Sequence, residues 1–364
     1  MIDNMKNKKE IKKCHDIKHL RRKLASKAKR HFRNIAHNGM TKIEKKRHLA
    51  ERRIRENVKY YKHLYAPENF SLLDNTEEVV AFIKDVDKCY EKRRNIFIEM
   101  SKVQHIAHGA IVVLLSILVQ FKSQRLKVNG SFPINKEARN ILKESGFIEN
   151  LYKEHIEDRN DYYIGTKIYT HANRTADPTL SDSIIQNASK IIWGEERRCI
   201  GLQRVFLELM QNTNNHASKI IGEKLWWSSI VPVQKANGQI DKVCFSFIDY
   251  GIGIFSSLSN KSQGVFVGVM DKIKQIFGEI NDAEMMRLLL QGEIHRTATG
   301  HAYRGKGLPG IYNAMQKNHI SNLKIISNYA YANVAENQYK TLKSGFSGTY
   351  VYWELNNSNK NYKL

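Results

Sequence analysis

The chain has 364 residues, enough for two or three domains with apolar cores of their own. Its formal net charge of +23 is uneven, because residues 1–66 hold 22 Lys or Arg against 6 Asp or Glu, a net +16. The longest apolar run, Ala110 to Phe121, is too short to span a bilayer, and no apolar segment follows the charged start as in a signal peptide. We therefore expect a cytoplasmic protein without membrane contact.

The four cysteines are spread along the chain without the paired spacing of zinc or redox motifs. This pattern predicts free thiols in a reducing compartment. The residues are Cys14, Cys89, Cys199 and Cys244.

Residues 1–66 are predicted to form a basic helical arm. Between residues 15 and 66, apolar residues recur at helical spacing in two stretches separated by Asn38-Gly39. The Lys- and Arg-rich faces suit nucleic acid or another phosphate-rich partner, and the equally weighted alternative is a solvated helical hairpin packed on its own body or on an acidic protein partner. The two apolar stripes are Ile17, Leu20, Leu24 and Ala28, then Ile54, Val58, Tyr61 and Tyr65.

Residues 78–152 alternate between helical and strand patterns, which predicts a small parallel sheet. This segment resembles STAS-like domains related to anti-sigma antagonists, in which a serine before the buried helix is phosphorylated. Here that turn is Ile106-Ala107-His108-Gly109, without a hydroxyl group, so the resemblance implies a docking or scaffold module. No carboxylate or cysteine accompanies His105 and His108, so we expect no metal there. The expected elements are helix 79–90, strand 95–100, helix 110–124, strand 125–129 and a helix from Pro133 to Gly146.

Residues 153–184 are polar and are predicted to be a linker, or an edge hairpin around residues 162–165. Ser181, Asp182 and Ser183 offer N-cap side chains for a helix that runs to Trp193. A second helix follows, in which Glu208, Asn212 and His216 are four residues apart and share one face. A carboxylate beside an amide oxygen suits a magnesium–nucleotide site, because the amide binds the cation and the carboxylate orients water.

A strand is predicted from Asp241 to Asp249, because Val243, Phe245 and Phe247 alternate. A carboxylate at the strand end, followed by Gly251 and Gly253, can accept a hydrogen bond from an adenine amino group.

A glycine-rich turn precedes a helix expected from about Pro309. Its free amides can hold phosphate at the helix N-terminus, and its two basic side chains add positive charge. The residues of this loop are Arg304, Gly305, Lys306, Gly307 and Leu308. A last segment, Gly348-Thr349, reads as a turn that enters a C-terminal strand.

In this order, the four segments resemble the GHKL ATPase superfamily, which includes gyrase B subunits, heat-shock chaperones, mismatch-repair ATPases, histidine kinases and anti-sigma kinases. The resemblance covers roughly residues 185–356. It implies that Glu208 polarises the attacking water, that Asn212 ligates Mg²⁺, and that Asp249 and Thr349 contact adenine. Gly251 and Gly253 then shape the pocket floor. Gly305, Gly307 and Leu308 form the hinge of an ATP lid spanning residues 254–304.

Two departures limit the resemblance. Related kinases often have a basic residue just before the position of His216, where this chain has Asn215, so Arg304, Lys306 or His216 is expected to compensate. His155 lies in no apolar dimerisation repeat and thus starts no phosphoacceptor helix, which argues against an orthodox sensor histidine kinase. The chain also lacks the Gly-x-x-x-x-Gly-Lys-Ser/Thr signature of P-loop proteins.

The sequence therefore predicts an α/β (α+β) protein: a basic helical arm (1–66), a small α/β domain (78–152), a linker (153–184) and a C-terminal two-layer α/β sandwich (185–364) with a mixed sheet. The expected function is a Mg-ATP-dependent ATPase whose lid closure gates association with a partner such as nucleic acid. Two alternatives stay open, an anti-sigma-type Ser/Thr kinase and a non-hydrolysing ATP-binding subunit. A homodimer or a multi-protein complex fits each of them.

Overall fold

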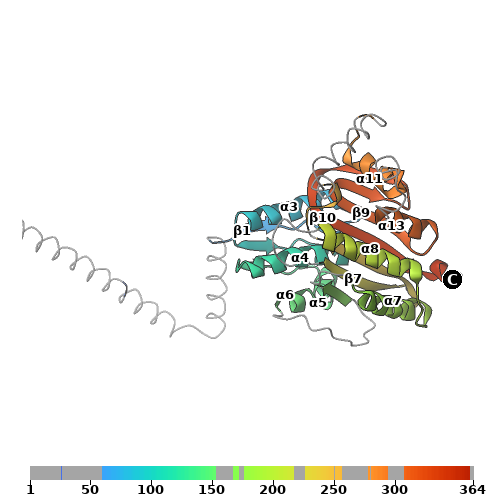
Figure 1. Cartoon of the computed structure of the whole chain (residues 1–364). Coiled ribbons are helices and arrows are strands. Elements are labelled where there is room, and N and C mark those ends of the chain that lie inside the picture. Colours follow the sequence, from blue (N-terminus) through green and yellow to red (C-terminus); the bar gives the residue numbers. More distant parts are fainter. Residues whose placement is uncertain are drawn as a thin grey trace, which may run out of the picture. The chain divides into compact units, whose positions relative to one another are not determined.

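A computed structural model describes residues 26, 60–152, 167–171, 176–216, 226–249, 251–255, 278, 280–293 and 307–360. The chain divides into two units, residues 1–61 and 62–364, so the segments 78–152 and 185–364 lie in the same unit. Of the first unit only Ser26, Tyr60 and Tyr61 are described, and the apolar stripes predicted between residues 17 and 58 lie outside the described residues. The second unit is a mixed α/β structure with parallel and antiparallel sheets (Figure 1).

The N-terminal part of the second unit contains the predicted parallel sheet, with strand order β1-β3-β5. A two-stranded parallel pair, β2 and β4, lies at its end. The strands are β1 (Lys62–Tyr65), β2 (Asn69–Phe70), β3 (Ile96–Glu99), β4 (His105–Ile106) and β5 (Val128–Gly130), and the helices are α3 (Thr76–Glu91), α4 (His108–Ser123), α5 (Lys136–Glu144) and α6 (Phe147–Tyr152).

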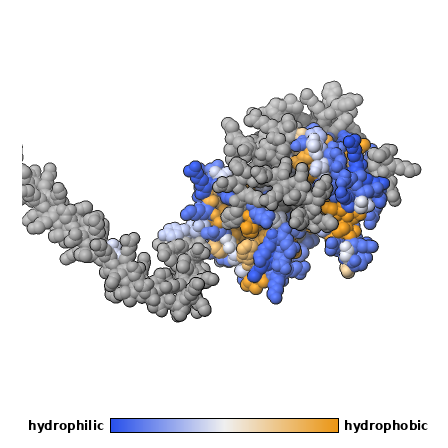
Figure 2. Space-filling model, turned by 90° about the horizontal axis from the view of Figure 1, so that it is seen from below, coloured by the Kyte–Doolittle hydropathy of each residue, from blue (hydrophilic) through white to orange (hydrophobic). Residues whose placement is uncertain are grey.

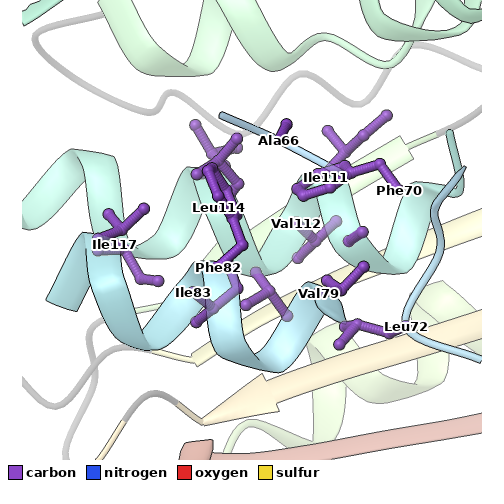
Figure 3. Packing of buried hydrophobic residues seen from close by; sticks show 14 of the residues in the cluster. Ala66, Phe70, Leu72, Val79, Phe82, Ile83, Ile111, Val112, Leu114 and Ile117 are labelled. Carbon is purple, nitrogen blue, oxygen red and sulfur yellow. The ribbon is translucent and has the colours of Figure 1, made fainter. Parts of the chain in front are cut away.

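The core of this part is built around α4, which is buried on nearly every side from Gly109 to Phe121. A helix that is apolar all round must be covered all round, and here α3 and the strands cover it. Figure 3 shows side chains of α3 and α4 packed together, among them Phe82, Ile83 and Leu114. The expected strand–helix alternation of residues 78–152 is thus confirmed, and the strand expected at residues 125–129 lies at 128–130.

The C-terminal part contains a five-stranded sheet in the described residues, with strand order β6-β7-β8-β10-β9. Every pairing described in it is antiparallel, so the predicted mixed sheet was wrong for these strands. The strands are β6 (Lys167–His171), β7 (Trp226–Gln234), β8 (Ile240–Asp249), β9 (Ser321–Asn333) and β10 (Gln338–Asn356), and the helices are α7 (Pro178–Trp193), α8 (Ile200–His216), α11 (Asp282–Gln291) and α13 (Gly307–Gln316); a short 3₁₀ helix, η1 (Asn357–Asn359), follows β10.

The two faces of this sheet belong to two different cores, because successive side chains of a strand point to opposite faces. Phe245 and Trp353 stack on one face, where α7, α8 and α13 cover them. Tyr350 and Tyr352 point to the other face and join the core of α3 and α4. In Figure 1, α8 and α13 lie on the same face of the sheet. The sheet therefore lies between the N-terminal part and helices α7, α8 and α13, and packs against both.

Gly109 sets the distance between α4 and the sheet. A methyl group on its Cα would lie 2.1 Å from Tyr350 Oη, which shares a hydrogen bond of 3.0 Å with Ser246 Oγ. Two further contacts join α3 to β10: Ser347 Oγ donates to Asp87 (2.8 Å) and the Lys343 amide donates to Glu77. At its closest approach to the sheet, α4 therefore carries no side chain.

Three predicted element boundaries were wrong. Residues 62–65 form strand β1, not the end of a basic helix, because they pair in parallel with β3. The predicted linker contains β6, which pairs with β7, and it also contains the start of α7. That helix begins at Pro178 rather than after Ser181, because the Asp177 side chain accepts a hydrogen bond from the Leu180 amide (2.9 Å).

Gly348-Thr349 is not a turn that opens a strand. Both residues lie inside β10, where the pairing with β9 shifts register between Phe346 and Thr349. Gly348 has a φ of 100°, a conformation that glycine adopts at β-bulges without steric cost. A single residue with positive φ therefore bends the strand rather than ending it.

In the described part of the chain, no helix is long and apolar enough to cross a membrane. Cys89, Cys199 and Cys244 are free thiols as predicted, and Cys14 lies outside the described residues. Among the described residues on the face shown in Figure 2, hydrophilic residues alternate with apolar patches.

We predict that Gly109→Ala lowers the free energy of unfolding by about 1–3 kcal/mol, because the added methyl group overpacks the contact between α4 and Tyr350. Urea unfolding of the two proteins measures the difference. Tyr350→Phe removes the atom nearest to the methyl group, so the double variant should lose less stability than the two single losses added together. Strictly additive losses would contradict the contact.

A second prediction concerns the stability of the protein at acidic pH. Burial lowers the pKa of His108 from 6.5 to about 4, and among the described residues its Nδ1 has no hydrogen-bond partner. Between these values the unfolded chain binds the proton and the folded chain does not, so stability falls as the pH drops from 6.5 to 4. The loss from this group is at most about 3 kcal/mol.

His108→Gln should remove this part of the pH dependence, measured as the difference in unfolding free energy from the wild type across pH 4 to 6.5. The exposed His105 provides the matched control, and His105→Gln should leave the wild-type profile in place. A difference between His108→Gln and the wild type that does not vary with pH would contradict a neutral His108 in the folded protein.

Candidate functional site

Helix α8 places Glu208 and Asn212 on its side facing α13. Phe206 and Met210 of the same helix are completely buried against the sheet, which fixes the rotation of α8 about its axis. Glu208 and Asn212 are both half-buried, with 20% of the Glu208 side chain exposed. The carboxylate and the amide therefore lie at the border between the core and the solvent, where both can meet a ligand.

The first turn of α13 lies directly against these two side chains. A methyl group on Gly307 would be 3.0 Å from Asn212 Nδ2 and 3.4 Å from Glu208 Oε2. A methyl group on Gly310 would be 3.8 Å from Glu208 Oε1. The two glycines thus present bare backbone to the carboxylate and the amide. The glycine-loop residue Gly307 and the pair from α8 are neighbours in space, although about a hundred residues separate them along the chain.

Arg204 is a further charged group beside this pair. Its Nε lies 3.8 Å from Glu208 Oε1, one helical turn earlier on α8. The Arg204 side chain is 55% exposed, so solvent screens the ion pair and its effect on stability is small. The position of Arg204 is more important than the energy of its ion pair. Its guanidinium group lies next to Gly310, in the first turn of α13 and close to Glu208.

The donor atoms of this corner could supply one or two oxygen ligands to a magnesium ion. Mg²⁺ prefers oxygen ligands and commonly takes only one or two from the protein. Asn212 offers an amide oxygen and Glu208 a carboxylate beside it. In the described residues, no three His, Cys, Asp or Glu side chains are grouped closely enough to hold a metal by themselves. A cation at this corner would therefore need ligand oxygens to complete its shell.

A row of residues crosses the sheet at the level of Asp249. Asp249 pairs with Trp226 on β7 and with Thr349 on β10, and Thr349 pairs with Ser327 on β9. Directly paired residues point to the same face of a sheet, which here is the face covered by α7, α8 and α13. The predicted neighbours Asp249 and Thr349 therefore lie next to each other, beside the ring of Trp226.

The segment after Asp249 is held against β9 by two consecutive residues. Asn328 Nδ2 donates to the Ile252 carbonyl (3.0 Å), and its Oδ1 accepts from the Phe255 amide (3.0 Å). Ser327 Oγ accepts from the Ile254 amide (2.9 Å). A methyl group on Gly253 would lie 2.5 Å from Asn328 Oδ1, and the φ of Gly253 is 79°. Gly253 is thus needed for the approach to Asn328.

Helix α11 joins the two ends of the site. Ile254 and Phe255 pack against its buried residues Met285, Leu288 and Leu289, and Leu308 packs against the same cluster. The segment that follows Asp249 and the start of α13 therefore share one apolar contact surface. The helical pattern expected at residues 282–290 is confirmed as α11.

Several predicted site residues lie outside the described residues, namely Arg304, Gly305, Lys306 and most of the expected lid. His216 is the last residue of α8. Of the described set, Glu208 and Asn212 lie beside Gly307, Asp249 lies beside Thr349, and Gly251 and Gly253 follow Asp249. Leu308 completes the contact through α11.

The sequence interpretation missed Ser327, Asn328, Trp226 and Arg204. Ser327 and Asn328 stand in a strand without a glycine or a repeated motif to mark them, so only the pairing of β9 reveals their contacts. The run from Trp226 to Gln234 carries a β-strand composition that could have indicated β7. The spacing of Arg204, four residues before Glu208, was a readable signal for an ion pair.

Comparison of the chain with protein-family models, with curated proteins and with solved structures found no match. A function for this chain is therefore inferred from the geometry of the described residues and from the motifs of the sequence.

Proposed function

We propose that the C-terminal part of this protein binds Mg-ATP and hydrolyses it, in a two-layer α/β arrangement of the GHKL type. The observation that supports this most directly is the pairing of motifs distant in sequence. Glu208 and Asn212 face the glycine-bearing start of α13, and Asp249 is paired directly with Thr349 on the neighbouring strand. Four unrelated surface motifs would have no reason to meet in these two pairs.

The base is proposed to bind at the Asp249–Thr349 pair. A carboxylate accepts one hydrogen of the exocyclic amino group of adenine, and the Thr349 hydroxyl oxygen beside it can accept the other. The backbone of Gly251 and Gly253 carries no side chain that would narrow the space beside Asp249. Trp226, which stacks on Phe247 at 5.2 Å between ring centroids, gives this end an aromatic wall next to the carboxylate.

The phosphates are proposed to bind at the start of α13. The first amide groups of a helix have no acceptor within the helix and carry a partial positive charge, which favours an anion. Gly307 follows Arg304, Gly305 and Lys306 directly in the sequence, so two cationic side chains lie on the chain leading into this turn. Asn212 would hold Mg²⁺ with its amide oxygen. When bound, the metal would neutralise charge on the phosphate oxygens.

Glu208 is proposed as the general base. Its carboxylate is oriented toward the start of α13, where the terminal phosphate would lie, and can take a proton from an attacking water. Arg204 pairs with this carboxylate beside Gly310 and can help to hold it next to α13. Because Glu208 is half-buried, its orientation is better defined than that of an exposed side chain.

Lid closure over the nucleotide is the proposed link to a partner. Helix α11 contacts both the segment after Asp249 and the start of α13. A ligand bound at either of these places would therefore act on the same helix. The basic residues 1–61 are the proposed surface for the partner, nucleic acid or an acidic protein, and the STAS-like segment is a proposed docking module. A homodimer or a larger complex would place these surfaces on more than one chain.

We predict that Glu208→Gln lowers phosphate release from Mg-ATP by about 100-fold or more and leaves ATP affinity near the wild-type value. Phosphate release and calorimetric ATP binding are the two measurements. Gln211→Ala changes an exposed residue of the same helix and should behave like the wild type. Asn212→Ala should weaken ATP binding in magnesium far more than in EDTA.

The same assay separates the alternatives. ATP binding by the wild type without any phosphate release would contradict hydrolysis and favour a non-hydrolysing subunit. Transfer of labelled γ-phosphate to a serine or threonine of a partner protein would favour the kinase. Absence of ATP binding by the wild type would contradict the proposed site altogether.

A further prediction concerns the basic segment. A chain that starts at residue 60 keeps β1 intact, whereas removal of residues 1–66 would delete it. We expect the shorter chain to lose binding to DNA or RNA, together with the steep salt dependence that multiple phosphate contacts cause. Fluorescence anisotropy at several salt concentrations measures both. Nucleic-acid binding with an unchanged salt slope would contradict the role of this segment, and intact ATP binding serves as the control for folding.

A further inference from the structure

We infer that Ser327 and Asn328 are positioning residues that hold the base end of the nucleotide pocket, an inference that rests on the proposed function. They lie on β9, outside every motif that led to the site. Between them they contact two segments beside the pocket, residues 252–255 and Gly348-Thr349 of β10. The two residues therefore connect the two groups proposed to contact adenine.

Asn328 spans the glycine turn with both ends of its amide. Its Nδ2 donates to the Ile252 carbonyl and its Oδ1 accepts from the Phe255 amide, each at 3.0 Å. These two backbone groups lie on either side of Gly253, so the amide replaces the backbone pairing that a strand would provide. The segment begins three residues after Asp249, and its conformation therefore determines the space beside that carboxylate.

Ser327 connects the same segment to Thr349. Its Oγ accepts from the Ile254 amide (2.9 Å), donates to the Gly348 carbonyl (2.8 Å) and lies 3.2 Å from Thr349 Oγ1. A hydroxyl group has one hydrogen to donate. Because that hydrogen is directed to Gly348, Thr349 is the donor in the contact with Ser327. The lone pairs of Thr349 Oγ1 then remain for a ligand, with their direction set by Ser327.

The backbone at Asn328 and Gly253 fits this role. Asn328 has a φ of 51°, in the left-handed region that asparagine tolerates better than most residues, and Gly253 has a φ of 79°. Both residues interrupt regular extended structure at the point where their atoms meet. Such local strain persists only where the surroundings hold it, as the hydrogen bonds of this cluster do.

The chemical consequence is base discrimination. Adenine presents an amino group where guanine presents a carbonyl oxygen, so a carboxylate and a hydroxyl can reject guanine only if their positions are fixed to a fraction of an ångström. Ser327 and Asn328 hold these positions from β9 through their hydrogen bonds. Loss of these hydrogen bonds should weaken the preference for adenine over guanine. It should leave the phosphate-binding end, built on α8 and α13, unchanged.

The test uses the full-length chain and three probes in magnesium buffer: ATP, GTP and inorganic tripolyphosphate, which has no base. Asn328→Gly removes the side-chain hydrogen bonds to Ile252 and Phe255 and accepts the positive φ. Asn337→Gly is the matched control, because Asn337 has a φ of 53° in an exposed turn between β9 and β10. Calorimetry gives the dissociation constant of each probe, and thermal unfolding without ligand compares the folds.

We expect Asn328→Gly to weaken ATP about tenfold or more, corresponding to the loss of one to two hydrogen bonds. Tripolyphosphate affinity should stay at the wild-type value, and the ratio of GTP to ATP dissociation constants should fall toward one. Asn328→Asp keeps the acceptor for the Phe255 amide and loses the donor to Ile252, so its effect should be intermediate. If Asn328→Gly does not fold, Asn328→Asp carries the test alone.

Two results would overturn the inference while leaving the proposed function intact. One is wild-type base selectivity in a folded Asn328 variant. The other is an equal loss of ATP and tripolyphosphate affinity, which would indicate a general structural role. A wild type that binds no ATP would overturn the proposed function, and this inference with it. The measurement on the wild type therefore separates the two failures.

Discussion

The register between β8 and β10 is the constraint on which the candidate site depends. It pairs Asp249 with Thr349, and the pairing of β10 with β9 brings Ser327 to the same level. A shift of one residue would turn these side chains to the opposite face, because neighbouring residues of a strand alternate between faces. The aromatic side chains of both strands oppose such a shift, since Phe245 and Trp353 stack directly across it at 5.3 Å. The packing of the core therefore holds the polar row in place.

Both faces of the sheet are buried, which couples the site to the N-terminal part of the unit. Tyr350, adjacent to Thr349, points to the opposite face and meets Gly109 at the start of α4. Tyr329, adjacent to Asn328, receives Lys84 of α3 over its ring at 5.7 Å, and its amide donates to Asp282 at the start of α11. A ligand that changed the position of β9 or β10 would thus also act on α3 and α4. This geometry gives the proposed docking module a physical connection to the proposed nucleotide site.

Elements with a clear hydrophobic periodicity were predictable from the sequence. Elements that were short, or that lay in a highly charged segment, were not. The apolar run of α4, the alternation of β8 and the helical spacing in α8 and α11 each identified an element correctly. β1 was assigned to a basic helix because Tyr61 and Tyr65 also fit a helical spacing, and four residues are too few to distinguish the two periods. Pairing with β3 decides the matter, and pairing is not a local property of the sequence.

By itself, the sequence determined which residue types were present at helical or strand spacing, and so which of them shared a face: Glu208 with Asn212, and Asp249 at the end of its strand. Only the tertiary structure decided which faces meet. It brought Gly307 to within contact of Asn212, placed Thr349 in a bulge rather than a turn, and revealed Asn328, whose role depends wholly on a strand from another part of the chain. The physical reason is that periodicity follows from local backbone geometry, whereas strand register and helix packing follow from complementarity between distant surfaces.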